Sequence, residues 1–325
     1  MGALAMAEWV GAVDGGGSKT HGALLSSDGE LLSLPADTGC NPMDNSDWAH
    51  VLDRMMGRFA DHAHNANNIA MGMPGFGEVR LLADLVSEQI TKHLGDRALI
   101  INDVEMAFHG AFPSGEGILL LAGTGSMAVA RGPKGLVRVG GWGDLFGDEG
   151  SAYWIGRSAL SLASRELDGR IPANGFALAL CAALELNCDE DPFALLNWVS
   201  RHQHVRSRIA SVAQSVDGMA SVGHQEAQQL LNDAALLLAE HISAAATLAG
   251  LPNEARWAFA GSVFNSDTLK QNVEIACGQS ATSAALPPLG GGLLLAARKS
   301  GWDFDPDFIS ELASQLAQSS PKRNS

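Results

Sequence analysis

Residues 10–25 read VGAVDGGGSKTHGALL, and the three glycines at the centre of this stretch decide the fold class. Apolar residues flank Asp14 and the glycines on both sides, as in a β-hairpin. Glycine is unfavourable inside a strand because it loses more backbone freedom on folding than any other residue. Three glycines in succession therefore predict a turn at which another group comes very close to the backbone.

A second glycine turn lies in residues 117–140, GILLLAGTGSMAVARGPKGLVRVG, which repeat the order strand, glycine turn, strand. Backbone N–H groups at such turns can converge on an anion such as phosphate. Neither turn has the glycine spacing of a P-loop or of a dinucleotide-binding fold, and one turn alone is equally typical of a simple hairpin. Two turns in equivalent places favour phosphate binding. Asp14 beside the first turn predicts a Mg²⁺ ion, held through water.

Strand and helix patterns alternate along the chain and predict two α/β domains. Glycine, proline and serine cluster in residues 110–117, GAFPSGEG, which places the expected boundary there. We expect residues 1–115 to form an N-terminal ATPase domain and residues 116–325 to form a C-terminal one. In the second domain, one helical pattern begins at Ala152, and another extends from Glu226 to Ala249. The last core helix is predicted to open with the segment PPLGGGLLLAARK.

The overall composition excludes several classes of function. The chain has 325 residues and a formal net charge of −15, which argues against nucleic acid or an anionic membrane as its main partner. Its N-terminal segment lacks the basic and apolar regions of a signal peptide. The 4 cysteines include no C-x-x-C pair, so we expect neither a disulfide framework nor a zinc site, and we expect a reducing cytoplasm.

Five segments together resemble a known superfamily. They are VDGGGSKT (13–20), NDVEMAFHG (102–110), AGTGS (122–126), GGWGDLFGDEGSAYWIG (140–156) and AGSVFNS (260–266). Their order is similar to that in the superfamily of sugar kinases, actin and heat-shock ATPases, and most similar to its branch of N-acetylglucosamine kinases and BadF/BcrA-type ATPases. The resemblance implies an α/β fold of two ribonuclease-H-like (actin-like ATPase) domains, with mixed sheets flanked by helices and an interdomain cleft. It also implies ATP and Mg²⁺ as cofactors, and we expect a cytoplasmic homodimer.

The resemblance assigns the nucleotide-binding residues. It implies that the ATP phosphates contact Gly15, Gly16, Gly17, Ser18, Lys19 and Thr20 in the first turn and Gly123, Thr124, Gly125 and Ser126 in the second. Gly261 and Ser262 are implied to border the adenosine, and Asp14 is implied to hold the metal. The glycine turns and these assignments agree on where the phosphates bind.

The resemblance also assigns the acceptor side. Asp103 matches the family's catalytic base, although an aspartate before a helix is also a common N-cap. Asn41, Gly141, Asp148 and Ala152 match sugar contacts. Two of these have ordinary alternatives, because Asn before Pro is typical of a turn and Asp148 could cap a helix beginning at Gly150.

The predicted reaction is phosphorylation of an amino sugar, first of all N-acetylglucosamine to its 6-phosphate. Met127 stands where N-acetylglucosamine kinases of the animal type tend to have Asn, so glucosamine is an alternative acceptor. A BadF/BcrA-type ATPase without sugar kinase activity is a second alternative. Its iron–sulfur form would place Cys beside the second turn, where ILLLAGTGSM has none. A non-catalytic nucleotide-binding regulator would keep the turns but would not need Asp103.

Overall fold

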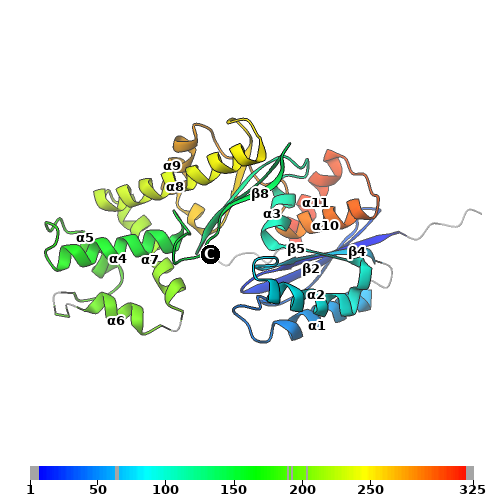
Figure 1. Cartoon of the computed structure of the whole chain (residues 1–325), viewed down its shortest axis with the longest axis horizontal. Coiled ribbons are helices and arrows are strands. Elements are labelled where there is room, and N and C mark those ends of the chain that lie inside the picture. The colour runs from blue at the N-terminus through cyan, green and yellow to red at the C-terminus, as the bar shows by residue number, and fades with distance from the viewer. Residues whose placement is uncertain (1–6, 63–65, 189, 192, 203, 320–325) are drawn as a thin grey trace, which may run out of the picture. The chain divides into compact units, whose positions relative to one another are not determined.

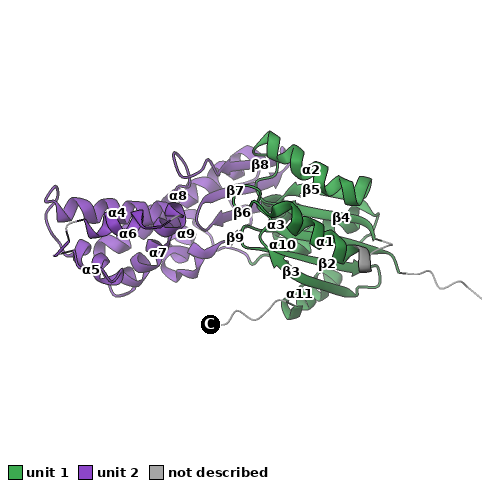
Figure 2. Ribbon diagram, turned by 90° about the horizontal axis from the view of Figure 1, so that it is seen from below, with its two compact units in different colours: residues 1–116, 283–325 green, residues 117–282 purple. Residues whose placement is uncertain are grey.

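The computed structural model describes residues 7–62, 66–188, 190–191, 193–202 and 204–319. The chain divides into two compact units, shown in different colours in Figure 2. Unit 1 comprises Met1–Glu116 and Ser283–Ser325, and unit 2 comprises Gly117–Thr282. Among the described residues, no helix combines the length and apolar content needed to cross a membrane.

Unit 1 is built on a five-stranded mixed sheet. Its described elements are β1 (Trp9–Gly15), β2 (Lys19–Ser26), β3 (Leu31–Thr38), α1 (Trp48–His62), β4 (Ala66–Met73), α2 (Arg80–Leu94), η1 (Gly95–Arg97), β5 (Ala98–Asn102), α3 (Asp103–Ala111), α10 (Pro288–Lys299) and α11 (Pro306–Ser319) (Figure 1). The strand order is β3-β2-β1-β4-β5. Strands β1 to β3 pair antiparallel, whereas β4 and β5 run parallel to β1. The first glycine turn joins β1 to β2.

Both faces of the unit 1 sheet are buried. Successive side chains of a strand point to opposite faces, so Val13 and Met71 pack in a cluster with α1 and α2, whereas Ala12 and Ala70 pack in a cluster with α3, α10 and α11. The side chains on the second face are small near the strand centres. This leaves room for α10 to pack directly on β1 and β4.

Unit 2 repeats the same arrangement with fewer strands. Its described elements are β6 (Gly117–Ala122), β7 (Ser126–Gly132), β8 (Gly135–Gly140), α4 (Ala152–Leu167), α5 (Phe176–Ala183), α6 (Ala194–Ser200), α7 (Val205–Ser221), α8 (Gln225–Ala249), β9 (Trp257–Ala260), η2 (Ser262–Asn265) and α9 (Asp267–Cys277) (Figure 1). The sheet order is β8-β7-β6-β9, with an antiparallel β6–β7–β8 meander and β9 parallel to β6. The second glycine turn joins β6 to β7, as the first turn joins β1 to β2.

The C-terminal segment differs from the expected division. The sequence assigns everything after residue 115 to the second domain, whereas residues 283–325 belong to unit 1. The cause is close backbone packing between α10 and α3. A Cβ at Gly291 would lie 2.2 Å from the Met106 carbonyl oxygen and 2.4 Å from the Gly110 nitrogen. Only glycine allows this approach, which buries the apolar face of α10 against the sheet of unit 1.

We expect Gly291→Ala to lower the free energy of unfolding by about 1–3 kcal/mol, because the added methyl group overpacks the contact between α10 and α3. Gly57→Ala in α1 is the matched control, since a Cβ there would meet nothing within 4 Å. That variant should be stabilised by about 0.5–1 kcal/mol through helix propensity. Denaturant unfolding measures both, and equal effects of the two substitutions would contradict this packing argument.

The structure corrects the expectation drawn from the cysteines. Cys181 and Cys188 form a disulfide, whereas Cys40 and Cys277 are free thiols. The chain turns back after α5, and the Leu186 N–H donates to the Cys181 carbonyl oxygen at 2.8 Å. This turn brings Cys188 to Cys181 although the two residues form no C-x-x-C pair.

Candidate functional site

The first glycine turn is supported by hydrogen bonds and by a neighbouring segment, and its tip is exposed. The Gly16 N–H donates to the Lys19 carbonyl oxygen at 2.9 Å, and the Cys40 N–H donates to the Gly16 carbonyl oxygen at 3.1 Å. A Cβ at Gly39 would lie 2.0 Å from the Gly17 oxygen, so the segment after β3 packs directly on the turn. Gly17, Ser18 and Lys19 are exposed. The predicted phosphate-binding backbone is therefore accessible and rigidly supported.

Asp14 and Asp103 form a pair of interacting carboxylates beside this turn. Burial, together with the negative charge of Asp103, raises the pKa of Asp14 to about 7. Asp14 is the next-to-last residue of β1, and Asp103 is the first residue of α3, directly after β5. A buried carboxylate that is disfavoured by a neighbouring negative charge gains from a hard cation beside it, which suits Asp14 to a metal. These residues fit a Mg²⁺ ion that keeps most of its water ligands.

A fully protein-built metal site is not found in the described part of the chain, where no group of three or more His, Cys, Asp or Glu residues could hold an ion. Mg²⁺ in nucleotide-dependent enzymes characteristically binds one or two carboxylates plus substrate phosphates. Asp14 supplies the one carboxylate that this smaller ligand set requires. The metal would therefore depend on the nucleotide for its remaining ligands.

The sequence offered Asp103 as a possible N-cap of the following helix, but the structure has another residue in that position. Asn102 is the N-cap of α3, and its Oδ1 accepts from the Val104 N–H at 2.9 Å. Asp103 Oδ1 also accepts from this N–H, at 3.0 Å. The residue that the helix requires as its cap is thus Asn102. The carboxylate of Asp103 also acts on Asp14, because its negative charge contributes to the raised pKa of Asp14.

Asn41 has the turn-forming role that its sequence allows. Its Oδ1 accepts from the Met43 N–H at 3.0 Å and its Nδ2 donates to Asp44 at 2.6 Å. The residue is half-buried and follows Cys40, whose N–H supports the first glycine turn. The structure thus places Asn41 in the same unit as Asp14 and Asp103. Its contact with a sugar stays a prediction.

The second glycine turn lies against the N-terminus of α4. The Gly123 N–H donates to the Gly125 carbonyl oxygen at 2.9 Å, and the Ala152 N–H donates to the Gly123 carbonyl oxygen at 2.9 Å. The buried Ser126 hydroxyl donates to the Glu149 carbonyl oxygen at 2.7 Å. These bonds tie the turn to the segment that follows β8. Both glycine turns are therefore fixed by a neighbouring loop rather than by their own strands alone.

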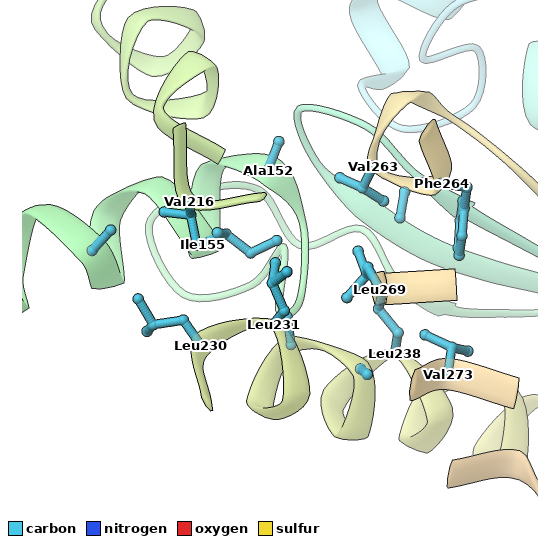
Figure 3. Close-up of a cluster of buried hydrophobic side chains, with 14 of the residues drawn as sticks. Ala152, Ile155, Val216, Leu230, Leu231, Leu238, Val263, Phe264, Leu269 and Val273 are labelled. Atoms are coloured by element: carbon cyan, nitrogen blue, oxygen red, sulfur yellow. The ribbon is translucent and has the colours of Figure 1, made fainter. Parts of the chain in front are cut away.

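A pocket of about 260 Å³ adjoins the second turn. Thr124, Ala152 and Ser262 line it together with residues of α7 and α9. Figure 3 shows the apolar cluster around this place, in which Ile155, Val263 and Leu269 converge from α4, η2 and α9. Gly261 supports the approach of η2 because a Cβ there would lie 2.1 Å from the Ala122 oxygen. A pocket with apolar side chains and a few hydroxyl groups suits a nucleoside, whose phosphates would lie near the second turn.

Asp148 connects three segments of unit 2. Its side chain is almost fully buried, its Oδ1 accepts from the Ser126 N–H at 3.2 Å, and its Oδ2 pairs with Arg206. It is not the cap of α4, because Ser151 Oγ accepts from the Trp154 N–H and the helix begins at Ala152. The clearest role of Asp148 in this structure is to fix the second glycine turn.

The two remaining predicted sugar contacts lie at different places in unit 2. The Gly141 N–H donates to the Ser126 carbonyl oxygen at 3.0 Å, and a Cβ at Gly141 would lie 2.4 Å from the Met127 methyl carbon. Ala152 instead lines the pocket that Ser262 borders. Gly141 and Met127 thus form one surface, whereas Ala152 belongs with the expected nucleoside-binding residues.

Sequence reasoning missed Arg206, which lies at the second turn. No glycine motif or strand pattern surrounds this residue, and its partner Asp148 is 58 positions away in the chain. The only available signal was charge: an arginine near the start of a helix in a strongly acidic protein. Its position beside the second turn follows only from the folded structure.

The repeated sheets and the two supported glycine turns define an actin-like ATPase fold. The chain belongs to the BadF/BadG/BcrA/BcrD ATPase family, which it matches over residues 10–285. A crystal structure of a ROK family glucokinase from Streptomyces griseus, with glucose and AMPPNP bound, shares the fold alone: its TM-score is 0.54 at 15% identity, covering 90% of this chain and 98% of that one. The resemblance and fold class predicted from the sequence are confirmed.

Three further proteins are similar over most of the chain. The N-acetylmuramic acid/N-acetylglucosamine kinase of Clostridium acetobutylicum is 28% identical over 76% of this chain and 82% of its own length. The N-acetyl-D-glucosamine kinase of Dictyostelium discoideum is 26% identical over 75% and 81%, respectively. The structure of a candidate N-acetylglucosamine kinase from Chromobacterium violaceum has a TM-score of 0.68 at 26% identity, covering 89% of this chain and 99% of that one.

Proposed function

We propose that the protein is an ATP-dependent kinase that phosphorylates N-acetylglucosamine on its primary hydroxyl, with Mg²⁺ as the metal. The observation that carries this proposal is the pair Asp14 and Asp103 beside the first glycine turn. One carboxylate, Asp14, suffices for the metal, and the second, Asp103, supplies the base that an attacking sugar hydroxyl uses. The kinase names of the similar proteins support the same conclusion.

In this mechanism Asp103 accepts the proton of the attacking sugar hydroxyl. Asp14 would hold the Mg²⁺ ion, which would neutralise charge on the phosphates. The exposed amides of the first turn and the Thr124 and Gly125 amides of the second turn bind the phosphate oxygens. The pocket bounded by Thr124, Ala152 and Ser262 holds the nucleoside.

The acceptor preference rests on Met127 and Gly141. The Met127 methyl group packs closely over Gly141, whose positive φ of 71° favours glycine. A thioether methyl forms a flexible apolar wall, which suits the acetyl methyl of an N-acetylated sugar. We infer that Met127 replaces the amide found in animal-type relatives by an apolar contact, which retains N-acetylglucosamine as the acceptor.

A BadF/BcrA-type ATPase without kinase activity is the second candidate, because the family bears that name. An iron–sulfur cluster requires accessible thiolates at a shared surface. Cys40 is buried, Cys181 and Cys188 are bonded to each other, and burial and Glu274 raise the pKa of Cys277 to about 11. These thiols do not form the ligand set of a cluster, so the kinase is the better proposal.

The partner is a small sugar, which agrees with a net charge of −15 that disfavours nucleic acid. We further propose a cytoplasmic homodimer. Light scattering behind size-exclusion chromatography would test the homodimer, and a monomeric mass at all protein concentrations would contradict it.

A panel of acceptors tests the proposed reaction. ADP release from Mg²⁺–ATP would be measured with N-acetylglucosamine, N-acetylmuramic acid, glucosamine and glucose. We expect N-acetylglucosamine to give a higher kcat/KM than glucosamine, because only it can fill the apolar contact at Met127, and we expect Met127→Asn to change that ratio. A better rate with glucosamine or glucose would refute the N-acetyl preference, and no stimulation by any sugar would refute the kinase.

A further inference from the structure

Arg206 lies at the start of α7 and contacts the second glycine turn. Its terminal nitrogen pairs with Asp148 Oδ2 at 2.5 Å, and its Nε lies 3.7 Å from Asp144 Oδ1. A Cβ at Gly125 would lie 2.8 Å from that terminal nitrogen and 2.6 Å from Asp148 Oδ1. The absence of a side chain at Gly125 leaves room for the Asp148 carboxylate and the Arg206 guanidinium beside the turn. Nothing in the family motifs assigns a role to this arginine.

The exposure of the ion pair is unequal. The Asp148 side chain is 3% exposed, whereas the Arg206 side chain is 44% exposed. A guanidinium has five N–H donors in a planar fork, and among the described residues Arg206 pairs with Asp144 and Asp148. Part of the cation therefore faces solvent directly at the turn. A residue needed only to neutralise Asp148 would not require this exposed face.

The nearby pocket indicates which ligand the exposed face would meet. Ser207, the next residue, lines the 260 Å³ pocket together with Thr124 of the second turn and Ser262. A nucleoside in this pocket would direct its phosphates toward the turn at Gly125. Asp144 and Asp148 would repel those phosphates without a neighbouring cation. Arginine is well suited to phosphate because its fork can bind two oxygens at once.

We propose that Arg206 binds the phosphate groups of a nucleoside polyphosphate at the second glycine turn. The inference rests on the proposed function, since it concerns the nucleotide that the kinase uses. Asp148 holds the guanidinium in place through one nitrogen, and the more loosely placed Asp144 is the partner that the phosphate replaces. Asp148 thereby fixes the second glycine turn, through the Ser126 N–H, and places the Arg206 cation beside it.

Nucleotide binding without sugar tests this role directly. Calorimetry would compare ADP, AMP and adenosine on the parent protein, Arg206→Met and Arg206→Lys. Loss of a charge-assisted hydrogen bond should weaken ADP binding about 10- to 100-fold in Arg206→Met, while adenosine binding stays within about twofold. Arg206→Lys keeps the counter-charge of buried Asp148 and should show a smaller loss for ADP only. The salt dependence of ADP binding should fall in Arg206→Met.

Arg157→Met is the matched control, because Arg157 is an exposed arginine on α4 that lines a different groove of the same unit. It should leave ADP and adenosine binding unchanged. Equal losses for ADP and adenosine in the Arg206 variants would show a purely structural role and overturn the proposal. Unchanged ADP binding in Arg206→Lys and Arg206→Met, or no ADP binding by the parent, would also overturn it. A parent that binds ADP but phosphorylates no sugar would instead contradict the proposed function alone.

Discussion

Asp103→Asn is expected to lower the turnover number for sugar phosphorylation by about 10²–10⁴-fold, because it removes the group that accepts the proton of the acceptor hydroxyl. Asparagine has nearly the same shape, and the cap of α3 is provided by Asn102, so the fold should persist. The affinity for ATP should change little. Steady-state kinetics and calorimetry measure these two quantities separately.

Asp96→Asn is the matched control for this variant. Asp96 is an exposed residue of η1, directly before β5, and undergoes the same chemical change in the same unit. Its turnover should equal that of the parent. Near-normal turnover of Asp103→Asn would rule out the base assignment. A loss of turnover accompanied by an equal loss of ATP affinity would indicate a role in nucleotide binding instead.

Asp14→Asn should abolish phosphoryl transfer and yet stabilise the metal-free protein above neutral pH. The transfer is lost because a neutral amide is a poor ligand for Mg²⁺. The parent's ATP affinity should increase on addition of Mg²⁺, whereas that of the variant should not. Calorimetry with ATP, with and without Mg²⁺, distinguishes the two proteins.

The gain in stability follows from the raised pKa of Asp14, which burial and the charge of Asp103 move from 3.8 to about 7. Between these values the folded protein holds a proton that the unfolded chain has lost, so stability falls as the pH rises through this range. Asparagine carries no charge and escapes this loss. In metal-free buffer, Asp14→Asn should therefore melt at a higher temperature than the parent at about pH 8, with little difference near pH 4.

Asp96→Asn is again the control, and its melting temperature should equal that of the parent at both pH values. A variant of Asp14 that is no more stable than the parent at about pH 8 would contradict the charge coupling between Asp14 and Asp103. Retention of the full Mg²⁺ enhancement of ATP binding would contradict the metal assignment.

Features encoded by neighbouring residues could be predicted from the sequence. Both glycine turns lie between the expected strands, because the alternation of apolar residues and the glycines themselves determine them locally. The helix predicted at Glu226 to Ala249 appears as α8. Helix starts were less certain, since Asn102 and Ser151 act as caps in place of Asp103 and Asp148. A side chain one to three residues away can satisfy the same backbone donor.

Features that depend on distant contacts could not be predicted. The position of α10 in unit 1 depends on its close backbone contact with α3, at Gly291 and Gly110. The use of Asp148 depends on Arg206, which no motif marks. In both cases two segments far apart in the chain must first be brought together by the fold, and only then does the chemical reason for each residue become visible.

The most direct test of the proposed function is the product formed from Mg²⁺–ATP and N-acetylglucosamine. Mass spectrometry and phosphorus NMR should show one phosphoryl group transferred to the primary hydroxyl, with one ADP formed per product and little ADP formed when the sugar is omitted. ADP release at the same rate without sugar, and no phosphorylated sugar in the mixture, would contradict the conclusion that this ATPase-family protein is an N-acetylglucosamine kinase.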